Sequence, residues 1–326
     1  MRIDSVSLKR GTLAAVAASA ALCLAACGSS SPSTTPKSTS STSPSSSPSN
    51  PLGGAAPKGT VVVGSANFPE DELLAEIYVL ALQAKGIKVT PKFNIGAREV
   101  YYPEVEKGAI TIIPEYNGAL LTTSVDPTST AATTTQVNAA LAAKLPSSLG
   151  ILNSSPAQDK DSVTVTQAFA KQHHLTSIAN LKPIAKTITI GGPPEFNTRA
   201  DGLPGLKKNY GLTFKNFIPL EESGPITLAA LKDGRVQAAD VFTTTPQIIT
   251  DHLFSLADPK FVFAAQNVTP LVYKPAMNAT ITGVLNEISA KLTTTGLLAI
   301  DKAVILDKDP YAAVAAGWLK AVGITS

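Results

Sequence analysis

Beyond residue 59 the chain alternates short β-branched runs with stretches in which apolar residues recur at helical spacing. Residues 60–64 are a threonine, three valines and a glycine, a run that is typical of a strand covered on both faces. The pattern then predicts a helix over 69–85, a strand over 87–93, a helix from 96 and a strand over 110–113. This order is a βαβαβ unit, which builds a parallel sheet.

The same alternation restarts at about residue 161 and predicts a second lobe. Strands are predicted over 161–166, 187–192, 214–220 and 236–243, and helices over 177–181, 203–210 and 226–233. A further strand over 261–263, with 271–273 beyond it, precedes three helices over 280–294, 297–306 and 310–322. These helices have no sheet of their own to cover, so we expect them to return to the first lobe.

The third strand of the first unit leads to the strongest candidate for a binding residue. Ile110, Ile112 and Ile113 predict a buried strand that stops at Pro114, because proline cannot donate to a ladder. Ligands of open α/β sheets collect at the carboxyl ends of strands, where this strand places three polar residues, Glu115, Tyr116 and Asn117. Tyr116 is the first candidate; alternatively, its ring only covers an edge of the core.

The corner that joins the first strand to the first helix is a second candidate. Asn67 is predicted to cap this helix, with Pro69 in its first turn. Backbone N–H groups and the side-chain amide of Asn67 can hold a polar ligand group at such a corner, or can simply cap the helix.

Polar or aromatic residues also follow three strands of the second lobe. They are Phe196 to Arg199, Phe242 to Thr245, and Gln266 with Asn267. Tips of this kind are expected where two sheets face each other across a cleft. Arg199 can clamp a carboxylate through its planar fork; the alternative is a surface ion pair with Asp201 or Glu195.

The amino terminus predicts export and a lipid anchor. A basic head and a short apolar run lead to Leu24-Ala25-Ala26-Cys27, so residues 1–26 are expected to be a secretory signal peptide rather than a membrane span. The Leu-Ala-Ala-Cys sequence resembles the bacterial lipobox, which predicts lipidation of Cys27. Residues 27–58 are dominated by Ser, Thr and Pro and are expected to be a disordered tether.

Composition excludes several classes of function. Cys23 is lost with the signal peptide, so the mature chain keeps one cysteine and no internal disulfide. Of 27 basic and 24 acidic residues, 24 and 23 remain after cleavage, a balance that does not favour nucleic acid. The chain has no Gly-x-Ser-x-Gly elbow, no His-Glu-x-x-His helix and no Walker loop. We therefore expect no enzyme activity, no metal and no cofactor.

Several segments together resemble a known family. They are Val62 to Glu70, Asn94-Ile95-Gly96, Pro114 to Gly118, Arg199 to Leu206 and Lys208 to Gly211. The chain is similar to the substrate-binding proteins of glycine betaine, choline and proline-betaine ABC importers, and looks like the actinobacterial lipoprotein branch of the osmoprotectant ProX group.

This resemblance implies the two-lobe, type II periplasmic-binding-protein fold, with two hinge crossovers and the ligand in the interlobe cleft. Lobe 1 is then expected over 59–162 plus 268–326, and lobe 2 over 163–267. The family holds a quaternary ammonium in an aromatic cage and the solute's carboxylate on an arginine or backbone donors.

By position, Tyr116 matches a cage tyrosine and Arg199 the carboxylate-binding arginine. Asp161, Phe242 and Gln266 stand near the positions of further cage tyrosines, so the cage has fewer rings and a polyol, sugar-like or phenolic solute stays an alternative. The candidate ligand-binding residues are Asn67, Phe68, Glu115, Tyr116, Asp161, Phe196, Arg199, Phe242, Thr243, Gln266 and Asn267.

The sequence thus predicts a monomeric, lipid-anchored receptor on the extracytoplasmic face of the cell membrane. It would deliver an osmoprotectant, such as glycine betaine or a related quaternary amine, to the permease of an ABC importer. A surface lipoprotein without a transport role is the remaining alternative, and an extracytoplasmic enzyme on the same fold lacks a paired nucleophile and base.

Overall fold

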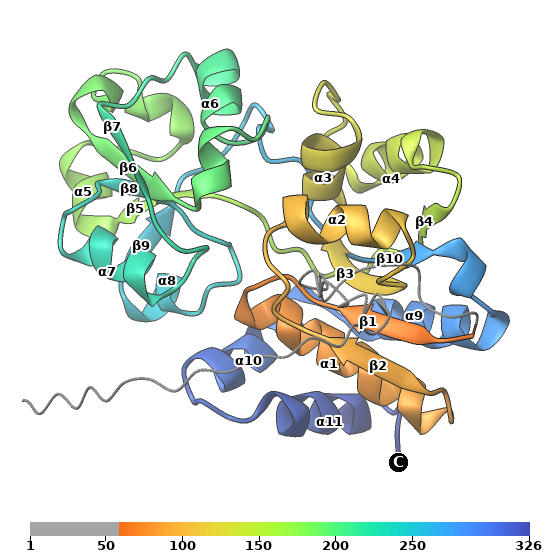
Figure 1. Ribbon diagram of the computed structural model, residues 1–326. Coiled ribbons are helices and arrows are strands. Elements are labelled where there is room, and N and C mark those ends of the chain that lie inside the picture. The colour runs from red at the N-terminus through yellow and green to blue at the C-terminus, as the bar shows by residue number, and fades with distance from the viewer. Residues whose placement is uncertain (1–58) are drawn as a thin grey trace, which may run out of the picture. The chain divides into compact units, whose positions relative to one another are not determined.

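A computed structural model describes residues 59–326, in which the strands form two five-stranded sheets (Figure 1). The predicted signal peptide, Cys27 and the tether lie outside the described residues. The first sheet has the order β2-β1-β3-β10-β4, with β10 antiparallel to both neighbours and β1 parallel to both of its own. Its strands are β1 (Val61–Gly64), β2 (Val89–Lys92), β3 (Ile112–Tyr116), β4 (Leu149–Ile151) and β10 (Val268–Tyr273).

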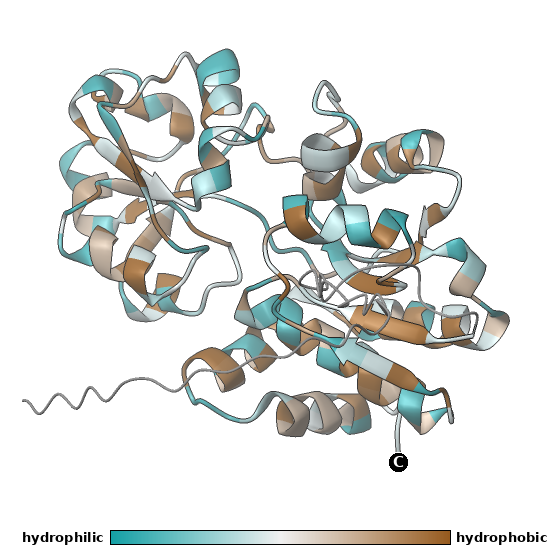
Figure 2. Ribbon diagram, in the orientation of Figure 1, coloured by the Kyte–Doolittle hydropathy of each residue, from teal (hydrophilic) through white to brown (hydrophobic). Residues whose placement is uncertain are grey.

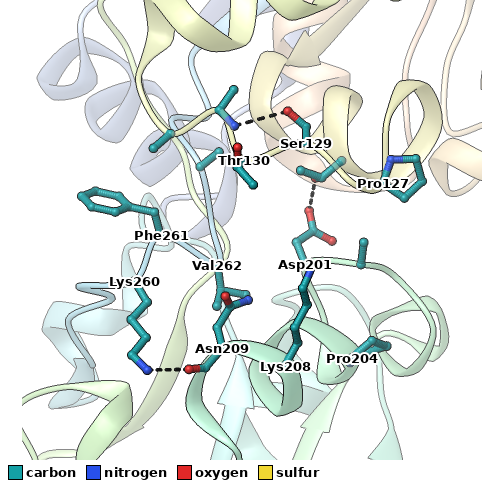
Figure 3. A pocket seen from close by; sticks show the side chains of 15 residues that line it. Pro127, Ser129, Thr130, Asp201, Pro204, Lys208, Asn209, Lys260, Phe261 and Val262 are labelled. Atoms are coloured by element: carbon teal, nitrogen blue, oxygen red, sulfur yellow. Dashed lines mark hydrogen bonds between the residues drawn. The ribbon is translucent and has the colours of Figure 1, made fainter.

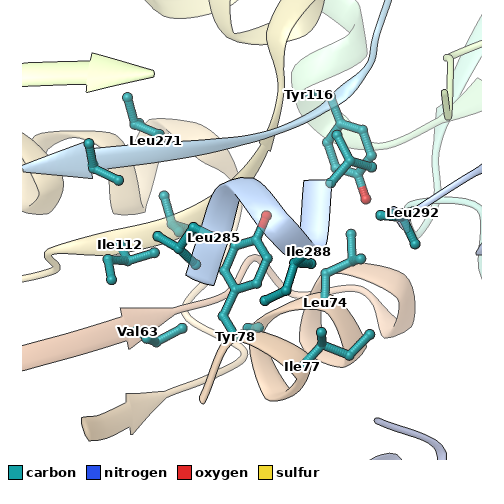
Figure 4. Packing of buried hydrophobic residues seen from close by; sticks show 14 of the residues in the cluster. Val63, Leu74, Ile77, Tyr78, Ile112, Tyr116, Leu271, Leu285, Ile288 and Leu292 are labelled. Carbon is teal, nitrogen blue, oxygen red and sulfur yellow. The ribbon is translucent and has the colours of Figure 1, made fainter. Parts of the chain in front are cut away.

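The helices around this sheet complete what we call the first lobe. They are α1 (Pro69–Ala84), α2 (Arg98–Glu106), α3 (Asn117–Leu120), the π-helix η1 (Leu121–Val125), α4 (Thr134–Lys144), α9 (Ala279–Lys291), α10 (Thr294–Ile305) and α11 (Tyr311–Ala321). The three C-terminal helices all contact α1. Tyr78, Ile112, Leu271 and Leu285 come from four different elements and meet in the core of this lobe (Figure 4).

The second sheet, in what we call the second lobe, has the order β7-β6-β8-β5-β9. Its strands are β5 (Val163–Thr166), β6 (Thr189–Gly192), β7 (Asn216–Pro219), β8 (Ala238–Asp240) and β9 (Leu253–Ser255). Its helices are α5 (Gln167–Gln172), η2 (Ile178–Leu181), η3 (Ala185–Thr187), η4 (Pro194–Asn197), α6 (Leu203–Tyr210), α7 (Pro225–Lys232) and α8 (Gln247–Thr250). The short 3-10 helix η5 (Lys274–Ala276) follows β10.

Inner strands of both sheets are largely apolar, as expected for strands covered on both faces. All four residues of β1 are buried, and the strand is hydrophobic along its length (Figure 2). In the second lobe, Ile190 of β6 and Ala238 of β8 are fully buried. The continuous β-branched run at 60–64 was therefore a sound predictor of a buried strand.

The chain passes between the two sheets twice, once between β4 and β5 and once between β9 and β10. The two crossover segments lie side by side, because Gln158 and Asn267 form an antiparallel bridge. A further pair of hydrogen bonds joins Asp161 to the side chain of Gln266. The exact residues at which each lobe begins and ends stay a prediction.

The prediction that the third strand stops at Pro114 is wrong. Strand β3 continues to Tyr116, and Pro114 lies opposite Pro270 of β10. Since neither proline has an N–H to donate, two prolines can face each other at a non-hydrogen-bonded position of an antiparallel ladder without losing a bond. The strand therefore extends two residues further than proline chemistry alone suggests.

Three other sequence predictions are also corrected. Residues 261–263 form no strand, and Phe261 has a φ of 52° that is incompatible with one. Strand β8 ends at Asp240, so Phe242 and Thr243 lie on a loop instead of a strand. Asn67 does not cap α1, because Phe68 holds the cap position and makes no side-chain cap bond. None of the helices within residues 59–326 has the length and apolar character to cross a membrane.

Candidate functional site

Three aromatic rings from both lobes form a cluster. Phe68 immediately precedes α1, Tyr116 ends β3, and Phe242 follows β8 of the second lobe. The ring centroid of Phe68 lies 5.9 Å from that of Tyr116 and 5.1 Å from that of Phe242. These tilted contacts are in the favourable range for aromatic pairs. Three of the candidate residues are therefore brought together as an interlobe cluster.

Glu70 joins this aromatic cluster to the second lobe. Its Oε1 accepts a hydrogen bond of 2.5 Å from the Tyr116 hydroxyl, and its Oε2 accepts one of 2.6 Å from the Thr244 hydroxyl. Glu70 lies in the first turn of α1, where the helix dipole favours negative charge. Burial, followed by the nearby carboxylate of Glu70, raises the pKa of Tyr116 well above its usual value. The phenol is therefore a neutral donor to Glu70.

A buried carboxyl on the first crossover contacts the same loop of the second lobe. Asp159 Oδ1 accepts hydrogen bonds from the Thr244 backbone N–H at 3.0 Å and the Thr243 hydroxyl at 3.2 Å. Burial and the charge of Glu70 raise the pKa of Asp159 well above its usual value. Thr243, a candidate ligand residue, thus serves the crossover in this conformation.

Arg199 is engaged by carboxylates on three sides. Its Nε and Nη2 each donate a hydrogen bond of 3.0 Å to Glu99 of α2, which makes a bidentate bridge between the lobes. Glu195 and Glu222 each lie 3.8 Å from its guanidinium. The ion pair expected with Glu195 is present but is longer than the pair with Glu99. The guanidinium that would hold a solute's carboxylate is therefore already neutralised by protein groups.

Asp201 does not pair with Arg199, although it stands two residues away. Its Oδ2 instead accepts a 2.6 Å hydrogen bond from Thr122 of η1, in the first lobe. Burial raises the pKa of Asp201 to about 6 and, with the charges of Asp161 and Glu195, raises the pKa of Glu222 to about 7. This part of the interface therefore holds acids that stay protonated well above the usual range.

Glu115 is a structural residue of the first lobe. It is fully buried and forms a bidentate salt bridge with Arg98 of α2, at 2.9 Å. The Tyr101 hydroxyl donates a further 2.8 Å bond to it. Such a buried, hydrogen-bonded pair fixes α2 against β3 and leaves no lone pair of Glu115 directed at the aromatic cluster.

The remaining candidates lie in the core, in the crossovers or on the surface. Phe196 is buried in the core of the second lobe, and Asn67 is exposed. Gln266 exchanges two hydrogen bonds with Asp161, while Asn267 bonds Asn117, Ser155 and Thr134. Asp161, Gln266 and Asn267 thus form the crossover network rather than a free binding surface.

Sequence reasoning missed Glu70, Asp159 and Asp301, and it placed Thr244 only within the predicted tip from Phe242 to Thr245. Glu70 carried a signal, because an acid in the first turn after the Asn-Phe-Pro corner points toward the strand ends. Asp301 on α10 carried none, since only the return of the C-terminal helices to α1 brings it near Glu70. Within residues 59–326, no three His, Cys, Asp or Glu side chains are grouped as metal ligands.

A hollow of about 290 Å³, separate from the aromatic cluster, lies beside Thr122 and Asp201 (Figure 3). The loop 127–132 of the first lobe lines one side of it, and α6 with residues 260–262 of the second lobe lines the other. Lys260 is held away from its centre by a bond to the backbone oxygen of Asn209 (Figure 3). The wall of this hollow mixes polar and apolar side chains, and none of the three aromatic rings of the cluster lines it.

Two α/β sheets, two crossovers and side chains from both lobes that meet between them define a two-lobe solute-binding protein of the type II periplasmic class. Residues 59–321 match the family model described as the substrate binding domain of ABC-type glycine betaine transport systems, and the chain belongs to this family. Its members are substrate-binding receptors that serve an ABC permease. Proteins of this class bind a small molecule outside the cytoplasm.

Curated relatives and solved structures agree with this assignment. The chain is 27% identical to the glycine betaine-binding protein YehZ of Escherichia coli, over 84% of this chain and 93% of that protein. It is 25% identical to a glycine-betaine-binding protein of Pseudomonas aeruginosa, over 82% of this chain and 89% of that protein. Its fold is similar to that of a crystal structure described as a glycine betaine/carnitine/choline ABC transporter. The TM-score is 0.64 and the identity is 20%, over 81% of this chain and 99% of that one.

Proposed function

We propose that this chain is a lipid-anchored receptor, attached at Cys27, that binds an osmoprotectant with a quaternary ammonium group between its lobes and delivers it to the permease of an ABC importer. It works as a monomer outside the cytoplasm. Its residues perform no covalent step: they bind the solute, exclude water and hold the closed form.

The aromatic cluster carries this proposal. A quaternary ammonium has no N–H to donate, so ring faces attract it best, with about 0.5 to 2 kcal/mol from each ring. Phe68, Tyr116 and Phe242 supply three rings from two lobes, and Glu70 adds a carboxylate beside them. A cation held by these groups contacts both lobes and therefore favours the closed form over the open one.

Closure is also supported by direct contacts between the lobes. Thr244 bonds Glu70, Arg199 bonds Glu99, and Thr122 bonds Asp201. All of these bonds break if the lobes separate, so the solute and the protein groups stabilise the same closed conformation.

Calorimetric titration of the purified chain with choline, glycine betaine and carnitine tests the proposal. We expect Phe68→Ala and Phe242→Ala each to weaken binding of the tightest of these solutes by about tenfold, which corresponds to about 1.4 kcal/mol. Phe254→Ala, which removes an exposed ring on β9, is the matched control and should bind normally. Saturable binding of a polyol, a sugar or a phenolic, with no response to any quaternary amine, would replace this proposal by the alternative solute class.

The lipid anchor has its own test. In cells that express the full chain, Cys27→Ala should move the protein from the membrane fraction to the soluble exported fraction, because one removed acyl site abolishes the anchor. Ser29→Ala is a control that leaves the cysteine intact. An unchanged membrane fraction for Cys27→Ala would contradict the anchor without touching solute binding.

A further inference from the structure

A small cavity beside the aromatic cluster has acceptors that lack partners. It measures about 60 Å³, and its walls include Phe68 and Glu70 of the first lobe and Phe242 of the second. Asp301 of α10 also lines it, is 1% exposed, and accepts no hydrogen bond from an N–H or hydroxyl group, although it lies near enough to Glu70 for the two carboxyls to share a proton. The buried Oε1 of Gln247, on α8 of the second lobe, lines it too and is likewise without a partner.

A proton on Asp301 can be shared with Glu70, and the acceptors that remain, including the buried Oε1 of Gln247, need a donor or a cation. Leaving a buried acceptor unpaired costs about 1 to 3 kcal/mol, and more for a carboxylate. The remaining wall combines apolar side chains with the 222–224 and 244–245 loops; its residues are Pro69, Pro225, Ile305, Glu222, Ser223, Gly224, Thr244 and Thr245. At about 10 to 15 Å³ for each water-sized group, the cavity of about 60 Å³ has room for about four to six such groups. It therefore fits a methylated ammonium group and is smaller than a sugar ring.

The acidic groups around this cavity face no free cation. No lysine, arginine or histidine lines it within residues 59–326. Arg98 is committed to Glu115, and Arg199 is shared among Glu99, Glu195 and Glu222. A carboxylate on the solute would thus meet buried acids and no free cation. A solute with positive charge alone would be attracted by the same groups.

On the basis of the proposed function, we infer that this receptor selects a small organic monocation without a carboxylate over a zwitterionic betaine. The ammonium group lies in the cavity lined by Glu70, Asp301, Phe68 and Phe242. The carboxyl of Asp301 carries a proton when no cation is bound, and binding releases that proton to solvent.

The proton follows from the groups that surround Asp301. Burial, Glu70 and Asp159 raise the pKa of Asp301 well above its usual value. Two other titratable groups are placed near it: Glu222, which lines the same cavity, and Tyr311 of α11, whose pKa is raised in part by Asp301. None of these is a cation, so only a bound cation can supply the countercharge. Binding therefore favours the ionised form of Asp301, and affinity for the cation rises with pH.

Choline and glycine betaine are a matched pair of probes, because they share the trimethylammonium group and only the betaine has a carboxylate. We titrate the full chain with each at pH 6, in MES and in bis-Tris, which both buffer near this pH and whose ionisation enthalpies differ. The buffer dependence of the binding heat counts protons released. We expect choline to bind at least tenfold more tightly than glycine betaine and to release protons on binding. Because a proton is released, the affinity for choline should increase from pH 5 to pH 7.

Two variants locate the proton. Asp301→Asn should weaken choline binding by about tenfold and abolish most of the proton release. Asp309→Asn, an exposed acid beyond the same helix, should leave both unchanged. Thermal unfolding of each variant confirms that it is folded.

The possible results separate this inference from the proposed function. Glycine betaine binding as tightly as choline, or choline binding without proton release that depends on Asp301, overturns the inference and leaves the receptor function standing. Failure of both probes to bind, together with binding of a solute that has no ammonium group, overturns the proposed function as well.

Discussion

The hydroxyl of Thr244 donates a 2.6 Å hydrogen bond to Glu70, although the two residues belong to different lobes. The same carboxylate accepts the Tyr116 hydroxyl. One side chain of α1 thus accepts hydrogen bonds from donors in both lobes and links the two lobes in this conformation. Removal of either donor would leave Glu70 partly unsatisfied in a buried position.

Thr244→Val should weaken solute binding by about three- to tenfold, because the closed form loses a charge-assisted hydrogen bond of about 1 kcal/mol while the shape of the side chain is kept. Titration calorimetry measures the affinity. Small-angle X-ray scattering without solute should show a larger radius of gyration for Thr244→Val than for wild type. Thr250→Val, at an exposed position of α8, is the control. Equal affinity in wild type and Thr244→Val would show that this bond does not contribute to closure.

Arg199 and Glu99 should be energetically coupled in binding. Arg199→Gln alone and Glu99→Gln alone each break the interlobe bridge, so the double variant should lose less affinity than the sum of the two single losses. A coupling energy of about 0.5 kcal/mol or more is expected for such a pair. The losses in binding free energy could instead be additive, and Arg199→Gln could weaken the binding of glycine betaine but not of choline. That result would show that Arg199 breaks its bridge to Glu99 when a solute binds and contacts the carboxylate of the solute.

Arg98 should matter for folding more than for affinity. Arg98→Ala leaves the fully buried Glu115 without its cation, and breaking a buried pair in this way costs about 3 to 5 kcal/mol. Urea unfolding should show this loss as a lower midpoint. Lys107→Ala, which removes the exposed end of the pair with Glu104, should cost at most about 1 kcal/mol. Similar midpoints for the two variants would refute the structural role assigned to Arg98.

Stability should fall as pH rises through the weakly acidic range. The pKa of Glu222 is raised to about 7 and that of Asp201 to about 6 by burial. The unfolded chain releases these protons near pH 4 to 4.5. Between these values the folded state holds more protons than the unfolded state, so the free energy of unfolding decreases with increasing pH.

Glu222→Gln isolates one of these groups. From pH 4.5 to pH 7.5 the free energy of unfolding should decrease in both proteins, but the decrease should be smaller in the variant by about 1 kcal/mol or more. The size follows because a pKa shift of one unit corresponds to about 1.4 kcal/mol. Urea titrations at four pH values in this range provide the measurement. Glu287→Gln, on the exposed face of α9, should follow wild type, and a wild-type slope in Glu222→Gln as well would show that Glu222 titrates normally.

The apolar pattern by itself predicted most of the elements. Helix α6 has the predicted bounds and ends at Gly211, whose φ of 68° suits glycine. Strand β1 and helices α1, α7 and α9 lie within a few residues of their predicted positions. Periodicity predicts these elements because each of them buries one continuous face, and the apolar residues therefore recur at the spacing of that face.

Local sequence was a poor guide where a partner strand decides the outcome. Strand β3 continues through Pro114 only because Pro270 lies opposite it. Nothing near Leu253 predicted β9, a three-residue strand that depends on pairing with β5. Short strands have too few residues to show a period, so their existence is settled by their neighbours.

The sequence alone determined the family segments, the α/β alternation and the candidate rings Phe68, Tyr116 and Phe242, because these follow from local pattern and residue chemistry. Only the tertiary structure decided which charges meet. It assigned Glu115 to Arg98 and Arg199 to Glu99, and it brought Asp301 from α10 to Glu70 of α1. Charge pairing depends on distances between residues far apart in the chain, and these distances exist only once both sheets are folded.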